Sequence, residues 1–285
     1  MSTDYKSIFF GTSRFSVIVF DELRKQNIVP KLLVTQPDRP QGRKLQITPP
    51  PAKVWATEQN IPVCQPENLQ TIQNICPQIS DADVYIVASY GTILPAWLLS
   101  LPRRGVLNVH PSLLPKYRGA SPIQSAILAD DRETGVTIIA LDRKMDHGPI
   151  VAQQKKETPM WPPTATELEE TLARAGGKLL ADVLPQWLTG EISPREQEHD
   201  KATFTKKIVK EDGKLDLSAD PYQNFLKIQA LEPWPGTFFF TNRNGRKIRI
   251  KIIAASYKNR TLSITKVIPE GGREMPYEDF NGNLT

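Results

Sequence analysis

Apolar and polar positions along the chain follow strand and helix patterns in turn. Continuous apolar runs, typical of buried strands, occur at residues 8–10, 32–35, 83–88, 106–110 and 135–141. Helical spacing of apolar residues favours helices at 15–25, 52–59, 121–129 and 166–188, the last with a possible irregularity at Gly176-Gly177. Strands that alternate with helices predict an α/β fold with a doubly wound, mostly parallel sheet, as in Rossmann-like domains.

A polar stretch at 191–200 separates two regions of different pattern. Beyond it we expect a helix at 222–230 and strands at 238–240, 248–254 and 262–267. The sequence therefore predicts a first domain at 1–190, a linker at 191–200 and a small β-rich domain at 201–285. A length of 285 residues suits two domains.

Residues 36–51 read QPDRPQGRKLQITPPP, a basic and proline-rich segment. Its prolines exclude a regular helix or a central strand. Long segments of this kind in compact domains are often functional. The first strand-to-helix turn, Gly11-Thr12-Ser13, lacks the Gly-x-Gly-x-x-Gly pattern, which argues against a nicotinamide dinucleotide enzyme.

Asn108 and His110 end the predicted strand at 106–110. Residues i and i+2 of a strand point to one face, so both side chains emerge where open α/β sheets bind ligands. An amide donor can stabilise an oxyanion and an imidazole can accept a proton. The pair suits attack of a nucleophile on a carbonyl group.

The segments around this strand resemble the signature of the 10-formyltetrahydrofolate-dependent formyltransferases. Asn108-Val109-His110 is followed by Ser-Leu-Leu-Pro-Lys-Tyr-Arg-Gly at 112–119, and Met-Asp-His-Gly-Pro-Ile at 145–150 resembles the family's aspartate loop. The resemblance implies that Asn108, His110 and Asp146 form the catalytic set. In this set Asp146 would orient His110, and the neighbouring His147 would take no catalytic part.

A folate pocket is also implied by the resemblance, with 10-formyltetrahydrofolate as formyl donor and no metal. A flat pterin needs an apolar slot with backbone donors and acceptors. The residues expected to line it come from two loops: Ser89, Tyr90, Gly91, Ile93, Leu94, Ser112, Leu113, Leu114 and Pro115.

The C-terminal region is similar to that of methionyl-tRNA formyltransferases, through Leu-Glu-Pro-Trp-Pro-Gly at 231–236 and Gly-Arg-Lys-Ile-Arg-Ile at 245–250. The resemblance implies an OB-like domain, internally shortened between Ala255 and Leu262. It also implies initiator methionyl-tRNA as partner, with Arg39, Arg43 and Lys44 as candidate contacts, because Arg and Lys suit phosphates.

Charge is unevenly distributed. The net charge is +5, but residues 201–260 alone carry 13 Lys and Arg against 5 Asp and Glu. Such an imbalance suits a polyanionic partner for the C-terminal region, although charge alone favours the simpler interpretation of a solvated basic surface. The two cysteines, Cys64 and Cys76, are expected to be ordinary thiols, and together with the three histidines they lack metal-ligand spacing. Without a membrane span or a secretion signal, we expect a cytoplasmic protein, monomeric in our interpretation.

Three other interpretations use the same features. A formyltransferase acting on an amino sugar nucleotide would share the three catalytic residues and the C-terminal barrel, and a formyltetrahydrofolate hydrolase is a further enzyme of the same chemistry. A non-catalytic tRNA-binding protein belongs to another class. The basic segment at 36–51 and the positive C-terminal region argue against the first, and intact Asn108, His110 and Asp146 against the last.

Overall fold

The computed structural model describes residues 5–42, 45–243 and 245–282. These residues form two compact units, each assembled from separate stretches of the chain. The first contains 1–118, 133–156 and 169–204, and the second contains 119–132, 157–168 and 205–285. The predicted linker at 191–200 thus falls within the first unit, and the second unit takes in two short stretches, 119–132 and 157–168, of the predicted first domain.

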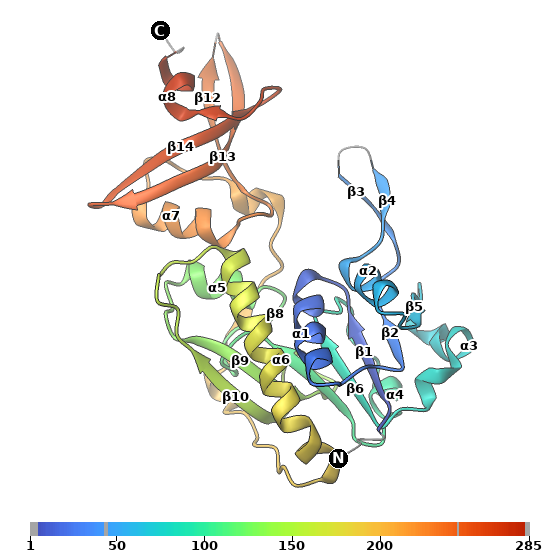
Figure 1. The fold of residues 1–285 in the computed structure, drawn as a ribbon. Coiled ribbons are helices and arrows are strands. Elements are labelled where there is room, and N and C mark those ends of the chain that lie inside the picture. The colour runs from blue at the N-terminus through green and yellow to red at the C-terminus, as the bar shows by residue number, and fades with distance from the viewer. Residues whose placement is uncertain (1–4, 43–44, 244, 283–285) are drawn as a thin grey trace. The chain divides into compact units, whose positions relative to one another are not determined.

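The first unit is built on a seven-stranded sheet of order β10-β9-β7-β6-β1-β2-β5 (Figure 1). Five strands are parallel: β1 (Ser7–Gly11), β2 (Leu32–Val34), β5 (Val63–Cys64), β6 (Val84–Ala88) and β7 (Val106–His110). Two pair antiparallel at one side: β9 (Thr134–Ala140) and β10 (Ile150–Lys156). From β1 the chain first adds β2 and β5 on one side and then adds β6, β7, β9 and β10 on the other. This order confirms the predicted doubly wound, mostly parallel sheet.

Each face of this sheet has its own core, because alternate strand residues point to opposite sides. Phe9, Leu33 and Leu107 pack in the cluster that holds residues of α1 (Arg14–Lys25), α2 (Pro51–Glu58) and α6 (Ala165–Thr189). Ile8 and Tyr85 pack in the opposite cluster, which includes residues of α3 (Ile72–Ile75), α4 (Ala96–Leu99) and the 3-10 turns Leu69–Thr71 and Pro77–Ser80.

The helix α6 runs unbroken through Gly176-Gly177, so the irregularity expected there is absent. The two glycines instead allow close packing. A Cβ on Gly176 would lie 2.5 Å from the Val109 side chain of β7, and one on Gly177 would lie 2.7 Å from Glu22 of α1. These positions bring α6 directly onto the strand that carries Asn108 and His110.

The proline-rich segment forms a separate two-stranded hairpin of β3 (Arg39–Gln41) and β4 (Gln46–Thr48) (Figure 1). It is neither helix nor central strand, as its prolines predict. Another short ladder pairs β8 (Arg118–Gly119) with β11 (Phe204–Thr205). Among the helices of the described residues, none combines the length and apolarity that crossing a membrane requires.

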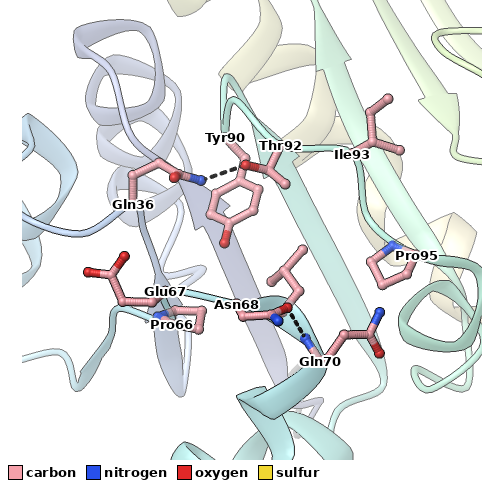
Figure 2. A pocket seen from close by; sticks show the side chains of 10 residues that line it. Gln36, Pro66, Glu67, Asn68, Gln70, Tyr90, Thr92, Ile93 and Pro95 are labelled. Atoms are coloured by element: carbon pink, nitrogen blue, oxygen red, sulfur yellow. Dashed lines mark hydrogen bonds between the residues drawn. The ribbon is translucent and has the colours of Figure 1, made fainter.

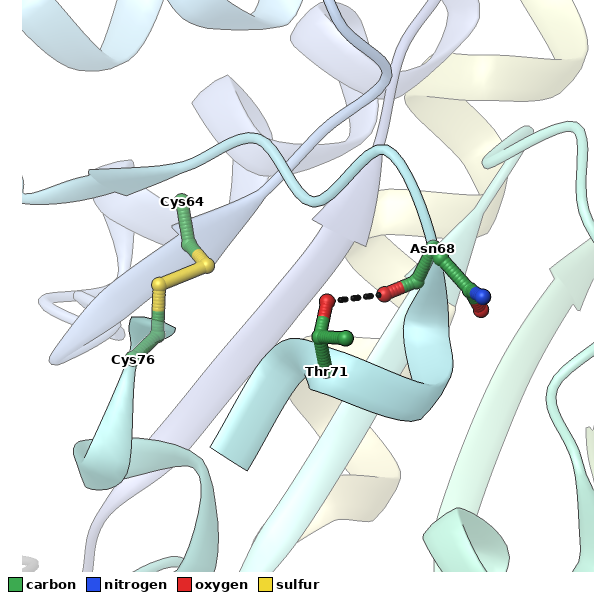
Figure 3. The surroundings of a disulfide bond; sticks show 4 residues. All are labelled: Cys64, Asn68, Thr71 and Cys76. Atoms are coloured by element: carbon green, nitrogen blue, oxygen red, sulfur yellow. Dashed lines mark hydrogen bonds between the residues drawn. A yellow bond between two sulfur atoms is a disulfide. The ribbon is translucent and has the colours of Figure 1, made fainter. Parts of the chain in front are cut away.

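The prediction of two ordinary thiols is wrong. Cys64, at the end of β5, forms a disulfide with Cys76, which ends α3 (Figure 3). The Cα atoms are 6.3 Å apart, within the range that a disulfide spans. Twelve positions of separation gave no sign of this proximity, because the intervening residues form an irregular connection with one short helix.

The second unit contains an antiparallel sheet of order β12-β13-β14-β15. Its strands are β12 (Thr237–Arg243), β13 (Arg246–Lys258), β14 (Thr261–Pro269) and β15 (Met275–Pro276). Its helices are α5 (Pro122–Leu128), α7 (Pro221–Ala230) and α8 (Tyr277–Gly282), with a 3-10 turn at Lys210–Gly213. A further 3-10 turn, His199–Lys201, belongs to the first unit. This small β-rich fold confirms the class predicted for the C-terminal region.

The segment between Ala255 and Leu262, where the resemblance implies shortening, contains a tight hairpin turn. Asn259 and Arg260 join β13 directly to β14, with φ angles of 50° and 62°. Two consecutive positive φ angles are the mark of a type I′ turn, whose twist matches that of the flanking strands. The short sequence between Ala255 and Leu262 is therefore sufficient to connect two long paired strands.

Candidate active site

Asn108 and His110 lie on one face of β7, at the carboxyl end of the parallel strands. All five residues of β7 are buried, and the strand is paired with β6 on one side and β9 on the other. Asn108 is 9% and His110 4% exposed. This double pairing fixes the backbone and therefore the direction in which both side chains leave the sheet.

Asp146 meets His110 from the loop between β9 and β10. Its Oδ1 lies 3.6 Å from His110 Nδ1, and both side chains are largely buried. That distance is longer than a direct hydrogen bond but short enough for an electrostatic interaction between the two side chains. The carboxylate of Asp146 therefore faces the ring of His110 closely enough to orient it.

The other ring nitrogen of His110 is held by the backbone. Its Nε2 lies 3.0 Å from the carbonyl oxygen of Tyr117. Because a carbonyl oxygen only accepts hydrogen bonds, Nε2 carries the proton in the neutral ring and Nδ1 keeps its lone pair. The atom of His110 that can accept a proton is therefore the one that faces Asp146. The loop at 112–119 supplies this contact, so it sets the tautomer of the histidine.

The Asp146 loop has a conformation that only specific residues allow. Asp146 has a φ of 49°, in the left-handed region that costs a non-glycine residue about 1–3 kcal/mol. At Gly148, a Cβ would lie 1.8 Å from the carbonyl oxygen of Ala140. The Asp-x-Gly spacing therefore places the carboxylate beside His110 while the following backbone passes directly against β9.

His147, between these two residues, is directed elsewhere. Its Nδ1 donates to Asp142 Oδ2 at 2.6 Å. Its ring stacks on that of His199, with centroids 4.0 Å apart. The side chain of His147 is therefore engaged by Asp142 and His199.

The Ser112–Pro115 residues of the predicted folate pocket are anchored to β9. Ser112 Oγ donates to the Lys116 carbonyl at 2.6 Å, and Thr137 Oγ1 donates to the Ser112 carbonyl at 2.6 Å. Leu114 is 3% exposed and packs against Ile139 and Ile150. The segment is tied down by these bonds and adjoins the end of β7, while Leu113 and Pro115 stay partly exposed.

The Ser89–Leu94 residues follow β6, the strand beside β7. Ser89 has a φ of 47° and Gly91 a φ of 89°, so the chain turns sharply there. The start of α1 holds this turn: Thr12 N donates to the Ser89 carbonyl at 3.2 Å and Thr12 Oγ1 to the Tyr90 carbonyl at 2.8 Å. Leu94 is buried in the core.

A cavity of about 280 Å³ opens at this edge of the sheet (Figure 2). Two of its lining residues, Tyr90 and Ile93, were predicted from the sequence. Burial raises the pKa of the Tyr90 phenol to about 12. The lining residues that sequence reasoning missed follow β2, β5 and β6: Gln36, Pro66, Glu67, Asn68, Leu69, Gln70, Thr92 and Pro95.

The missed residues share one position in the fold. Gln36 and Pro66 come just after β2 and β5, the strands on the far side of β1, and Gln36 Nε2 donates to Thr92 Oγ1 at 2.9 Å across the cavity (Figure 2). Ligands of open α/β sheets bind outside the carboxyl ends of strands near the point where strand order reverses. That rule could have indicated Gln36, whereas β5 is too short for any pattern to reveal.

Of the candidate basic contacts, Arg39 lies at the start of β3. Its side chain is exposed and pairs with Glu67, with nitrogen and oxygen 3.0 Å apart. Arg43 and Lys44 lie outside the described residues. The structure therefore places Arg39 beside a residue of the cavity rim and leaves the expectation for the other two untested.

Comparison with known proteins shows the family of the chain. A family model described as formyl transferase matches residues 5–184, and one described as formyl transferase, C-terminal domain, matches 207–261. A methionyl-tRNA formyltransferase of Chloroflexus aurantiacus is 41% identical over 277 residues, which cover 94% of this chain and 86% of the relative.

Solved structures share the fold at low identity. A methionyl-tRNA formyltransferase from Clostridium thermocellum has a TM-score of 0.61 at 18% identity, over 95% of this chain and 99% of that one. HypX from Aquifex aeolicus, in complex with tetrahydrofolic acid, has a TM-score of 0.67 at 14% identity, over 99% of this chain and 48% of that one. Both family models match in order along the chain, and the Chloroflexus relative aligns with 94% of it. The chain therefore belongs to the formyl transferase family.

Proposed function

We propose that this protein transfers the formyl group of 10-formyltetrahydrofolate to the α-amine of methionyl-initiator tRNA, in the cytoplasm where translation begins. The observation that carries the proposal is the pairing of His110 Nδ1 with Asp146 on the strand end that also presents Asn108. The methionyl-tRNA formyltransferase of Chloroflexus, aligned over most of both chains, supports the choice of acceptor.

The three side chains divide the chemistry of the transfer. The neutral amine attacks the formyl carbon, and the amide of Asn108 donates to the oxygen that becomes negative. His110 takes the proton of the attacking nitrogen at Nδ1, while Asp146 stabilises the resulting imidazolium. When the tetrahedral intermediate collapses, the bond from carbon to N10 of the folate breaks and His110 returns the proton to N10.

The folate would bind at the carboxyl ends of β6 and β7. The turn at Ser89, Tyr90 and Gly91, with Ile93 and Leu94, offers backbone groups and an apolar wall beside the cavity. The rigid loop of Ser112, Leu113, Leu114 and Pro115 flanks His110. The tetrahydrofolate complex of HypX, a protein of the same fold, supports a folate donor. No step of this reaction uses a metal.

A cationic face of the C-terminal sheet suits the tRNA. Lys247, Arg249 and Lys251 alternate along β13 with inward-pointing isoleucines, and all three are exposed. They lie opposite Asn242, Phe240 and Phe238 of β12. Lys247 Nζ lies 4.9 Å from the Phe240 ring centroid and the Arg249 guanidinium 5.2 Å from that of Phe238. Phe238 is buried, but Phe240 is 40% exposed. Cations beside an exposed aromatic ring are the combination that binds phosphates and stacks bases.

The β3–β4 hairpin is the second proposed contact with tRNA. Arg39, Arg43 and Lys44 belong to this segment, which stands apart from the main sheet (Figure 1). A nucleotide sugar is small and needs no such basic surface, so the hairpin and the cationic face favour tRNA over the amino-sugar acceptor.

The deciding experiment is formyl transfer from 10-formyltetrahydrofolate to methionyl-initiator tRNA, with methionyl-elongator tRNA as the matched control. Transfer to the initiator alone supports the proposal. Binding of folate without transfer to either tRNA would refute it in favour of an amino-sugar acceptor. Binding of tRNA without turnover would instead favour the non-catalytic alternative.

A further inference from the structure

Arg118 and Gln197 form a buried pair beside the Asp146 loop. Arg118 is 3% and Gln197 5% exposed. The Nε of Arg118 donates to Gln197 Oε1 at 3.1 Å, and one of its terminal nitrogens donates to the same oxygen at 2.6 Å. Arg118 directly follows Tyr117, whose carbonyl accepts from His110. The guanidinium is therefore anchored in the segment that sets the histidine tautomer.

The amide nitrogen of Gln197 reaches the backbone on both sides of His147. It donates to the carbonyl of Asp146 at 2.9 Å and to the carbonyl of Gly148 at 2.7 Å. A glutamine amide has two N–H groups, and here both are used on one loop. The oxygen of the same amide accepts both hydrogen bonds from Arg118. A 180° flip of the amide would therefore lose these two bonds and the two to the loop carbonyls.

A second contact joins Arg118 to the outer side of the loop. The same terminal nitrogen lies 2.8 Å from His199 Nδ1, which accepts because a guanidinium only donates. The His199 ring stacks on His147, and His147 bonds to Asp142. Burial lowers the pKa of Arg118, while the nearby Asp146 and Asp142 carboxylates oppose this effect.

The loop needs such support because Asp146 adopts a left-handed φ of 49°. A non-glycine residue keeps that conformation only when its surroundings over-determine it. The Gln197 amide binds the carbonyl of that very residue. If these bonds are lost, the backbone can relax and the carboxylate moves relative to His110.

We propose that Gln197 is a positioning residue for formyl transfer: its two amide protons hold Asp146 against His110, and Arg118 fixes the amide in that orientation. This inference rests on the proposed function, since it assigns a support to the carboxylate that acts there. It also gives residues 191–200 a role in the active site beyond that of a linker.

Gln197→Glu is the informative variant. A carboxylate of the same length still accepts from Arg118, but it offers no donor to the two carbonyl oxygens and repels them. We expect kcat for formyl transfer to fall roughly 10–100-fold, the cost of a displacement near 1 Å at a reacting group. The KM values for folate and tRNA should stay within about twofold, because the Gln197 side chain is buried and its hydrogen bonds are made within the protein.

Gln229→Glu is the matched control. Gln229 also donates its side-chain amide to a backbone carbonyl, that of Pro162 at 3.2 Å, but in the second unit. Its kcat should equal that of the wild type. If Gln197→Glu fails to fold, Gln197→Met removes the same donors without adding charge and takes its place.

Two measurements distinguish a positioning role of Gln197 from a general loss of structure in the variant. In an Asp146→Asn background, Gln197→Glu should lower kcat no further, because the carboxylate that it positions is gone; multiplied losses would overturn the proposal. Amide hydrogen exchange of residues 142–148 should rise in Gln197→Glu and not in Gln229→Glu, and unchanged exchange would also overturn it. The exchange measurement needs no turnover, so wild-type protein that transfers no formyl group would refute the proposed function separately.

Discussion

The cationic face of β13, formed by Lys247, Arg249 and Lys251, should determine how strongly the KM for tRNA depends on salt. Lys247→Gln, Arg249→Gln and Lys251→Gln together remove three exposed charges whose side chains do not enter the sheet core. Each phosphate contact lowers log affinity by about 0.9 per tenfold rise in salt, so three contacts account for a slope of about 2.7. Between 50 and 200 mM salt, the wild-type KM for tRNA should therefore rise up to about 40-fold more than that of the variant.

The assay is initial-rate formyl transfer at several salt concentrations, with the slope of log KM against log salt as the readout. A triple variant of Lys31, Lys155 and Lys156, exposed lysines of the first unit, makes the same change in net charge and serves as control. The argument fails if both triple variants lower the slope equally, since the effect would then come from net charge alone. An unchanged slope in the β13 variant would equally show that tRNA does not touch this face.

Five further substitutions test other parts of the structure. His110→Ala should lower kcat by about 10²–10⁴ and Asn108→Ala by about 10²–10³, both with wild-type melting temperatures; turnover near the wild-type value would remove that residue from the mechanism. Gly148→Ala should cost about 100-fold in kcat, because its Cβ would force the Asp146 loop off β9; single-turnover rates measure this, and an undiminished rate would contradict it. Cys76→Ser should lower the free energy of unfolding by about 3 kcal/mol in a urea titration, as should reductant on the wild type, because it opens a short closed loop; a reductant-insensitive midpoint would argue against the disulfide. Tyr90 has a pKa raised by burial from 10.0 to about 12, so its neutral form contributes stability that is present below pH 10 and lost as the pH rises through 12; Tyr90→Phe should flatten that decline in alkaline denaturation curves, and an equal decline in both proteins would disprove the assignment.

The central sheet was predictable because its strands are buried on both faces. The run at 8–10 is wholly apolar, the run at 83–88 has one charged residue, Asp83, and the run at 106–110 is polar only at Asn108 and His110. Each of these runs contains a fully buried strand. β10 was missed for the opposite reason: its second half, Gln153–Lys156, is exposed and reads like a loop. An edge strand gains its hydrogen bonds from a neighbour without burying side chains, so its sequence carries little signal.

The site was predictable only where its geometry is local. Asn108 and His110 share a face because they are two residues apart on one strand, and that spacing is visible in the chain. The approach of Asp146 depends on a left-handed backbone residue and on Gln197, which is 51 residues away in sequence. No periodicity encodes such a contact. The disulfide of Cys64 and Cys76 was missed for a related reason, since an irregular connection decides whether two cysteines meet.

The shortened C-terminal sheet bears on tRNA binding in a way that its length alone would not suggest. The proposed cationic face needs only β12 and β13, because the pairs Phe240 with Arg249 and Phe238 with Lys251 are set by the register of those two strands. The shortening falls at the far end of β13, where Asn259 and Arg260 turn the chain directly into β14. Further strands inserted at that turn would extend the sheet without altering the alternation that turns Lys247, Arg249 and Lys251 outward. The compact domain should therefore bind tRNA through this face with the salt slope worked out above.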